Sequence, residues 1–161
     1  MTGTEFREWV RKYNLADVNQ RESRFDTADW QICYSSDLNR AMQTARTVYN
    51  GDIIETQEIR EIPIEPVLTT PIKLPLTLWL ILGRLAWFVS HKSQTENRVQ
   101  TQIRVEKFVS QILSLKESSV LVVSHGGIIW LIRKELIKKG FVGPKFRKAK
   151  YGKLYIYEKL G

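Results

Sequence analysis

Apolar residues recur along this chain with two spacings, one typical of helices and one typical of strands. Spacings of three and four predict helices, and short apolar runs predict strands. The predicted helices cover residues 4–15, 38–49, 93–115 and 128–139. The predicted strands cover residues 31–34, 53–54, 120–123 and 154–157. Because helices separate the strands, we expect an α/β fold whose strands return in parallel.

The sequence also predicts helix ends and buried faces. Thr2 or Thr4 can cap the first helix, and the polar run Ser35, Ser36 and Asp37 supplies N-cap chemistry for the second. The helix over residues 93–115 is expected to bury one apolar stripe. That stripe consists of Val99, Ile103, Phe108, Ile112 and Leu115.

A proline-rich segment separates the second strand from the long helix and excludes a continuous helix there. Within it, residues 76–89 are rich in Leu and Trp and are expected to be broken at Gly83 and Arg84. This stretch is too short for a membrane span, which needs roughly twenty apolar residues. Two interpretations remain: one or two buried helices, or an interfacial helix that contacts a partner or a membrane through Trp79 and Trp87.

Length and charge restrict the function classes. With 161 residues, we expect a single domain over residues 1–161, with residues 63–92 as an apolar, proline-rich insertion. The chain has 25 Lys and Arg against 17 Asp and Glu, a net charge of +8, which favours an anionic ligand. No zinc-finger spacing or other nucleic-acid signature accompanies this charge, so nucleic-acid binding is not expected.

Cysteine and histidine usage adds further expectations. The single cysteine, Cys33, lies in an apolar run and is expected to be a buried, inert thiol, as in a reducing compartment. The first residues carry no secretory signal, so we expect a cytoplasmic protein. One cysteine and two distant histidines form no ligand cluster, and neither a metal nor a cofactor is expected.

Two segments place polar side chains directly after a predicted strand. The first passes through Ser35 and brings Arg40 into the first turn of the next helix. The second, Val-Leu-Val-Val-Ser-His-Gly-Gly, brings His125 and Gly126 to a helix start, which favours anions. If the strands are neighbours, Arg40 and His125 converge at the sheet edge where ligands of α/β proteins bind. Taken singly, the arginine is typical of a solvated surface and the histidine of a local backbone contact.

The run Ser-Ser-Asp-Leu-Asn-Arg-Ala-Met-Gln-Thr-Ala, followed later by Leu-Val-Val-Ser-His-Gly-Gly, resembles the paired motifs of the histidine phosphatase superfamily, also called phosphoglycerate mutase-like. The resemblance covers roughly residues 31–136, and residues 154–157 are similar to the C-terminal strand of the family. It implies a three-layer α/β/α sandwich with a mostly parallel sheet. It also implies hydrolysis of a phosphomonoester through a phosphohistidine.

The resemblance assigns roles to individual residues. Arg40 matches the second arginine of the family, and His125 matches its second, supporting histidine. Glu61 matches the acid that protonates the leaving oxygen, and Glu65 is a weaker match. The predicted phosphate-binding residues, which would hold a phosphorylated small molecule or a phosphate or sulfate ion, are Arg40, His125, Ser35 and Gly126.

One family element has no match in this sequence. The family's Arg-His-Gly strand supplies the nucleophilic histidine, whereas His91 follows no predicted strand and is expected at the surface. We therefore expect the fold to lack the first central strand, which would leave backbone groups unpaired at about 1–3 kcal/mol for each buried group. Either residues 154–157 pair directly with residues 120–123, or another chain fills the gap, as in a homodimer that exchanges strands.

This departure leaves several functions open. In one hypothesis, the chain binds phosphorylated ligands without turnover. In a second, residues upstream of Met1 complete an active phosphatase. In a third, the chain is a non-enzymatic module that contacts a partner or, weakly, a membrane surface. A further hypothesis makes His125 the nucleophile, although the resemblance places it beside the phosphoryl group rather than in line with it. The apolar insertion favours a bulky or apolar phosphoester and identifies no particular substrate.

Overall fold

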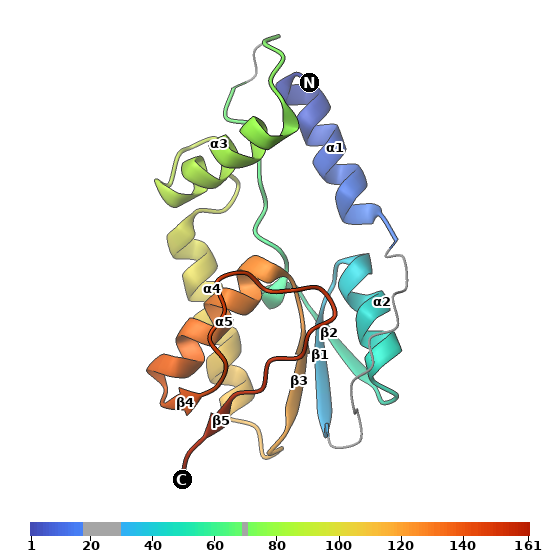
Figure 1. The fold of residues 1–161 in the computed structure, drawn as a ribbon, viewed down its shortest axis with the longest axis vertical. Coiled ribbons are helices and arrows are strands. Elements are labelled where there is room, and N and C mark those ends of the chain that lie inside the picture. Colours follow the sequence, from blue (N-terminus) through green and yellow to red (C-terminus); the bar gives the residue numbers. More distant parts are fainter. Residues whose placement is uncertain (18–29, 69–70) are drawn as a thin grey trace. The chain divides into compact units, whose positions relative to one another are not determined.

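Figure 1 shows the computed structural model of the chain, which describes residues 1–17, 30–68 and 71–161. The described residues divide into two compact units. The first unit comprises Met1–Ala16 and Ile62–Ile103, and the second comprises Asp17–Glu61 and Arg104–Gly161. The expectation of one domain over residues 1–161, with residues 63–92 as an insertion, stays a prediction.

In the described part of the second unit, three parallel strands form the main sheet. They are β1 (Ile32–Ser36), β2 (Ile53–Thr56) and β3 (Val120–Val123), in the order β2-β1-β3. Ser35 lies opposite Val123 in the register, so the carboxyl ends of β1 and β3 lie together. The strands predicted at 31–34, 53–54 and 120–123 are confirmed, and the first two extend two residues further.

Helices cover both faces of this sheet because successive strand residues point to opposite sides. On one face, Cys33 packs against α2 (Asn39–Val48). It is fully buried, which confirms the predicted burial, and burial raises the pKa of its thiol to about 11. On the other face, Tyr34 meets the ring of Phe108 in α4 (Arg98–Leu113), with ring centroids 5.5 Å apart. The unit is an α/β/α sandwich, as predicted.

The two helices that follow β1 and β3 begin at different residues from those predicted. The strand β1 continues through Ser36, so the cap predicted from the polar run 35–37 is wrong: Leu38 is the N-cap residue and its side chain makes no cap bond. Ser36 Oγ accepts the N–H of Leu38 at 3.3 Å instead. The helix α5 (Gly126–Lys138) begins two residues earlier than predicted, and His125 is its N-cap residue.

The predicted strand at 154–157 is wrong. Two short strands, β4 (Phe141–Val142) and β5 (Glu158–Lys159), form a separate antiparallel pair, and tyrosines of residues 154–157 bond the preceding loop instead. Within the described residues, β3 therefore pairs with β1 alone, and the expected pairing of 154–157 with 120–123 is wrong as well. Strand exchange with a second copy stays a prediction.

The first unit joins α1 (Gly3–Leu15) to α3 (Leu76–Phe88) through aromatic stacking. Phe6 and Trp79 are both fully buried, and their ring centroids lie 5.6 Å apart. A capping box centred on Thr2 starts α1, which confirms the predicted first helix and its cap.

The helix α3 is continuous, so the predicted break at Gly83 and Arg84 is wrong. Gly83 is buried, and a Cβ atom at this position would collide with the Cγ2 methyl of Ile64. The glycine therefore allows close packing of the helix on residue 64 rather than ending the helix.

The tryptophans of α3 contact other parts of the first unit, which argues against the alternative interpretation of Trp79 and Trp87 as surface anchors. Trp79 Nε1 donates to the carbonyl of Met1 at 2.8 Å, and Trp87 Nε1 donates to Oγ1 of Thr101 at 3.0 Å. The exposed apolar residues of α3 follow helical spacing: Leu78, Ile81, Leu85 and Phe88. Across the described ranges, no helix is both long and apolar enough to cross a membrane.

The helix α4 begins later than the predicted residue 93 because Asn97 and Gln100 form a reciprocal cap. The Asn97 side chain accepts the N–H of Gln100 at 3.0 Å, and the Gln100 side chain accepts the N–H of Asn97 at 2.9 Å. The predicted apolar stripe is wrong in its first half, since Val99 and Ile103 are 59% and 61% exposed. The buried apolar residues of α4 are Val105, Phe108, Val109 and Ile112.

Candidate functional site

His125 lies where β3 ends and α5 begins, and only 6% of its surface is exposed. Its Nε2 atom is 2.8 Å from Oγ of Ser36, the last residue of β1. The same oxygen already accepts the N–H of Leu38. Because Ser36 is fully buried and its hydroxyl hydrogen needs an acceptor, we assign that hydrogen to the Ser36–His125 bond, which leaves the ring hydrogen on Nδ1.

Charged side chains from three segments act on this imidazole. Burial contributes most, and with the positive charges of Arg40 and Arg104 it lowers the pKa of His125 to about 3 against the opposing charge of Asp37. Asp37 is held by Arg60, whose Nε donates to Oδ1 at 2.8 Å and whose Nη2 pairs with Oδ2. At neutral pH, His125 is therefore an uncharged imidazole within a positive environment.

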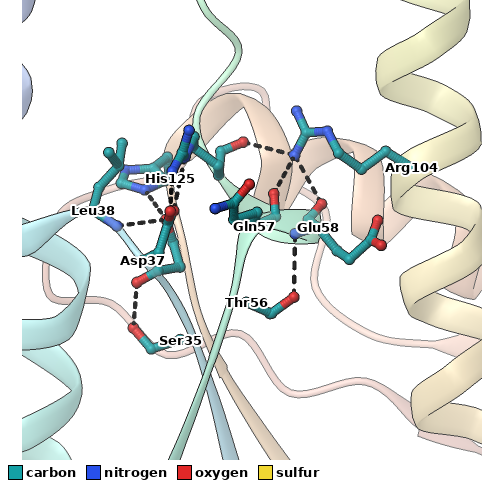
Figure 2. A network of polar contacts seen from close by, with 10 residues as sticks. Ser35, Asp37, Leu38, Thr56, Gln57, Glu58, Arg104 and His125 are labelled. Carbon is teal, nitrogen blue, oxygen red and sulfur yellow. Dashed lines mark hydrogen bonds and ion pairs between the residues drawn. The ribbon is translucent and has the colours of Figure 1, made fainter.

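Arg104 of α4 also organises the segment that leads from β2 to Glu61. Its Nη1 atom donates to backbone carbonyls around the short helix η1 (Gln57–Ile59), as Figure 2 shows. These carbonyls belong to Gln57, Glu58 and Arg60, at 3.3, 2.8 and 2.9 Å. Ser124, which precedes His125, donates to the carbonyl of Ile59 at 2.7 Å. These four bonds hold the backbone before Glu61 against α4 and near the end of β3.

A pocket of about 420 Å³ opens beside the start of α5. It combines the candidate acid, the glycines of the helix start and a basic segment that follows β4. Its lining residues are Glu61, Gly126, Gly127, Trp130, Arg147, Lys148 and Ala149. The helix start and the basic segment give this pocket a chemistry suited to anions.

The second unit contains all five predicted site residues. Arg40 lies close enough to His125 to depress its pKa, and Gly126 shares the pocket with Glu61. Ser35 differs from the expectation, since its hydroxyl is fully buried and donates to the carbonyl of Ser36 at 3.0 Å. The roles assigned to these residues stay predictions.

The weaker candidate acid, Glu65, and the predicted surface residue His91 both lie in the first unit. Glu65 forms an ion pair with Arg7, with 3.0 Å between the Oε2 and Nε atoms. His91 is exposed, as expected, and its Nδ1 atom is 2.9 Å from Oγ of Ser93. Among the residues that the structure describes, no group of three or more His, Cys, Asp or Glu side chains is placed to hold a metal ion.

Sequence reasoning missed two residues of this site, Ser36 and Arg104. Ser36 directly follows the predicted Ser35, and only the alternation of side chains along β1 decides which serine faces His125. Arg104 lies in a long helix, where an arginine is typical of a solvated face. No local signal marks Arg104, because its partners are more than forty positions away in the chain.

Comparison with known proteins identifies the class. The model of the histidine phosphatase superfamily (branch 1) matches residues 15–158, and the chain belongs to that superfamily. A comparison with curated proteins finds no match.

Solved structures of similar fold include two phosphatases. One is described as an α-ribazole-5′-P phosphatase from Escherichia coli, with 22% identity, a TM-score of 0.49 and coverage of 68% of this chain and 58% of that one. The other is a mycobacterial glucosyl-3-phosphoglycerate phosphatase, with 21% identity, a TM-score of 0.49 and coverage of 68% and 59%. This chain thus spans less than two thirds of the length of either protein.

Proposed function

We propose that the second unit binds the phosphoryl group of a phosphomonoester at the carboxyl ends of β1 and β3. In this proposal, Arg40 and the N–H groups at the start of α5 contact the phosphate oxygens, and His125 supports the same group. Glu61 protonates the leaving oxygen. These roles follow from the membership of the superfamily and from the positions of the residues in the second unit.

The observation that carries the proposal is the electrostatic state of His125. A buried imidazole that is kept neutral beside two guanidinium groups lies where an arriving anion relieves unfavourable positive charge. A bound phosphate dianion would raise the pKa of His125 by the same physics.

Titration with inorganic phosphate tests the binding site directly. We expect the ring resonances of His125 to shift with saturation and the pKa of this residue to rise. Arg40→Gln should weaken phosphate binding about tenfold or more, because a charged hydrogen bond is lost. Arg46→Gln is the matched control, since Arg46 is exposed in the last turn of the same helix. Equal affinities of the two variants would contradict the proposal.

We further propose that these 161 residues bind phosphomonoesters without forming a phosphohistidine. The sequence contains two histidines, and neither lies in an Arg-His-Gly run like that of the family nucleophile. Rapid-quench experiments with a ³²P-labelled phosphomonoester should detect no acid-labile phosphoenzyme above the level of a His125→Ala variant. A stoichiometric burst on the wild-type chain would overturn this part of the proposal and leave the binding site intact.

The exposed face of α3 favours a second, non-catalytic candidate, which is contact with an anionic membrane surface. Ile81 and Leu85 are exposed neighbours on this face, and the basic chain would be attracted to acidic lipids. In sedimentation with phosphatidylserine vesicles at low salt, Ile81→Ser/Leu85→Ser should stay in the supernatant while wild type pellets. Val142→Ser, at an exposed apolar residue of the second unit, is the control. Wild-type protein that stays in the supernatant would exclude this candidate.

A further inference from the structure

The basic segment after β4 lies directly against the start of α5. Arg147, Lys148 and Ala149 line the same pocket as Glu61. A Cβ atom at Gly126 would lie 3.8 Å from the Cβ of Ala149, so the segment passes within van der Waals distance of the first turn of the helix. The two cations are therefore neighbours of the proposed phosphate site rather than part of a remote surface.

Side chains from both sides hold this segment in place. The ring of Phe146 packs on Tyr155, with centroids 4.3 Å apart, and the guanidinium of Arg133 lies 5.8 Å from the Phe146 ring centroid. The hydroxyl of Tyr155 accepts the N–H of Lys150 at 3.0 Å. The residues on either side of Arg147 and Lys148 are thus anchored, which positions the two cations at the pocket wall.

The described lining of this pocket contains more positive than negative charge, with two cations and one carboxylate. Among the described residues, neither Arg147 nor Lys148 forms an ion pair, and the acidic residue that lines the pocket is Glu61. In the proposed function, the start of α5 contacts the phosphoryl group and Glu61 protonates the leaving oxygen. We therefore place Arg147 and Lys148, which share the pocket of Glu61, beside the leaving group. Two cations at that position select for negative charge on the leaving group.

We infer that the preferred substrate is a phosphomonoester whose leaving group carries its own anionic group, bound by Arg147 and Lys148. The inference rests on the proposed function of the same site and adds a substrate class to it. This anionic group is a carboxylate or a second phosphate. A guanidinium binds either of them with two parallel hydrogen bonds. The apolar wall of Trp130 and Ala149 lies beside the carbon skeleton between the two anionic groups.

Three probes on one scaffold test the inference through binding alone: phenyl phosphate, 4-carboxyphenyl phosphate and 1,4-phenylene bisphosphate. At low salt, we expect the wild-type chain to bind the charged probes about threefold to tenfold more tightly than phenyl phosphate, as for two partly exposed ion pairs. The ratio of the Kd values of 4-carboxyphenyl phosphate and 1,4-phenylene bisphosphate distinguishes a carboxylate from a second phosphate as the preferred anionic group. The ring resonances of His125 report occupancy in each titration.

Variants then assign the preference to the two residues. Arg147→Gln/Lys148→Gln should abolish the preference for the charged probes over phenyl phosphate, and Arg147→Glu/Lys148→Glu should reverse it. Lys116→Gln/Lys139→Gln, at exposed cations outside the pocket, removes the same charge and should keep the preference. Equal binding of all three probes by wild type would overturn this inference alone, whereas failure of phenyl phosphate to bind at all would overturn the proposed function with it.

Discussion

The Nε2 atom of His125 lies 2.8 Å from Oγ of Ser36, so the serine that ends β1 holds the histidine that follows β3. The two residues are 89 positions apart in the chain and come together because their strands are neighbours in the sheet. A hydroxyl that donates to Nε2 leaves Nδ1–H as the ring donor, which defines the form of the imidazole that meets a ligand.

Replacing Ser36 should therefore affect both the stability and the tautomer of His125. Ser36→Ala is expected to lower the free energy of unfolding by about 1–3 kcal/mol, because it leaves a buried ring nitrogen without its partner. The ¹⁵N shifts of the imidazole should change to those of a tautomer mixture. Ser35→Ala, which removes only a bond to the neighbouring carbonyl, is the control and should leave these shifts in place. Unchanged ring shifts in Ser36→Ala would refute the assigned tautomer.

The depressed pKa of His125 predicts a pH dependence of stability. The folded value is about 3 and the ordinary value is 6.5, so between these pH values the unfolded chain binds a proton that the folded chain does not. The free energy of unfolding should then fall with decreasing pH by up to about 1.4 kcal/mol per pH unit from this residue. Above pH 7 the effect is absent.

The comparison that isolates this effect is wild type against His125→Gln in urea unfolding at pH 7.5, 6, 5 and 4. Carboxylates affect both proteins alike, so the difference between the two curves belongs to His125. We expect the variant to gain stability relative to wild type as the pH falls below 6.5. Two curves that stay parallel over this range would show that the folded histidine titrates normally.

Arg104 should matter more for stability than its exposed neighbour on α4. Arg104→Met removes the donor that three carbonyls around η1 share, and of these the Gln57 carbonyl keeps the N–H of Arg60. The variant should lower the free energy of unfolding by about 1–3 kcal/mol. Lys107 lies on the same helix as Arg104 and forms a more exposed ion pair with Glu58 of η1. Lys107→Gln breaks this pair and should lower the free energy of unfolding by no more than about 1 kcal/mol. Chemical denaturation measures both, and equal effects would argue against the capping role of Arg104.

Gly83→Ala should destabilise the first unit, although alanine is the better helix former by about 1 kcal/mol. The added methyl collides with Cγ2 of Ile64, and overpacking of this kind costs about 1–3 kcal/mol. Ile64→Ala/Gly83→Ala should recover part of the loss, because the smaller side chain makes room. A double-mutant cycle with additive effects would show that the two residues do not compete for the same space.

The sequence predicted well wherever a pattern is local. The strand that leads to His125, the cap at Thr2 (one of the two predicted) and the burial of Cys33 all agree with the structure. Each depends on residues within one turn or one strand. The start of α4 was predicted too early, although the Asn97–Gln100 pair carries the spacing of a capping box and was a readable signal.

The predictions that failed depend on contacts between distant residues. Gly83 lies inside a continuous helix because Ile64 packs against it, and nothing near residue 83 indicates this. Residues 154–157 alternate like a strand, yet Tyr155 and Tyr157 bond the loop after β4 instead of extending a sheet. Alternation of apolar and polar residues is compatible with a strand or with an extended loop segment, and tertiary contacts decide between the two.

By itself, the sequence determined the three strands of the main sheet, the helices between and after them, and the superfamily motifs around Arg40 and His125, because spacing along the chain is enough for these. Only the tertiary structure decided that Ser36 rather than Ser35 meets His125, and that Arg104 acts on the same ring. The physical reason is that the register of β1 against β3 and the packing of α4 select one side chain among equivalent neighbours. That selection is made by residues far apart in the chain, and no local pattern contains it.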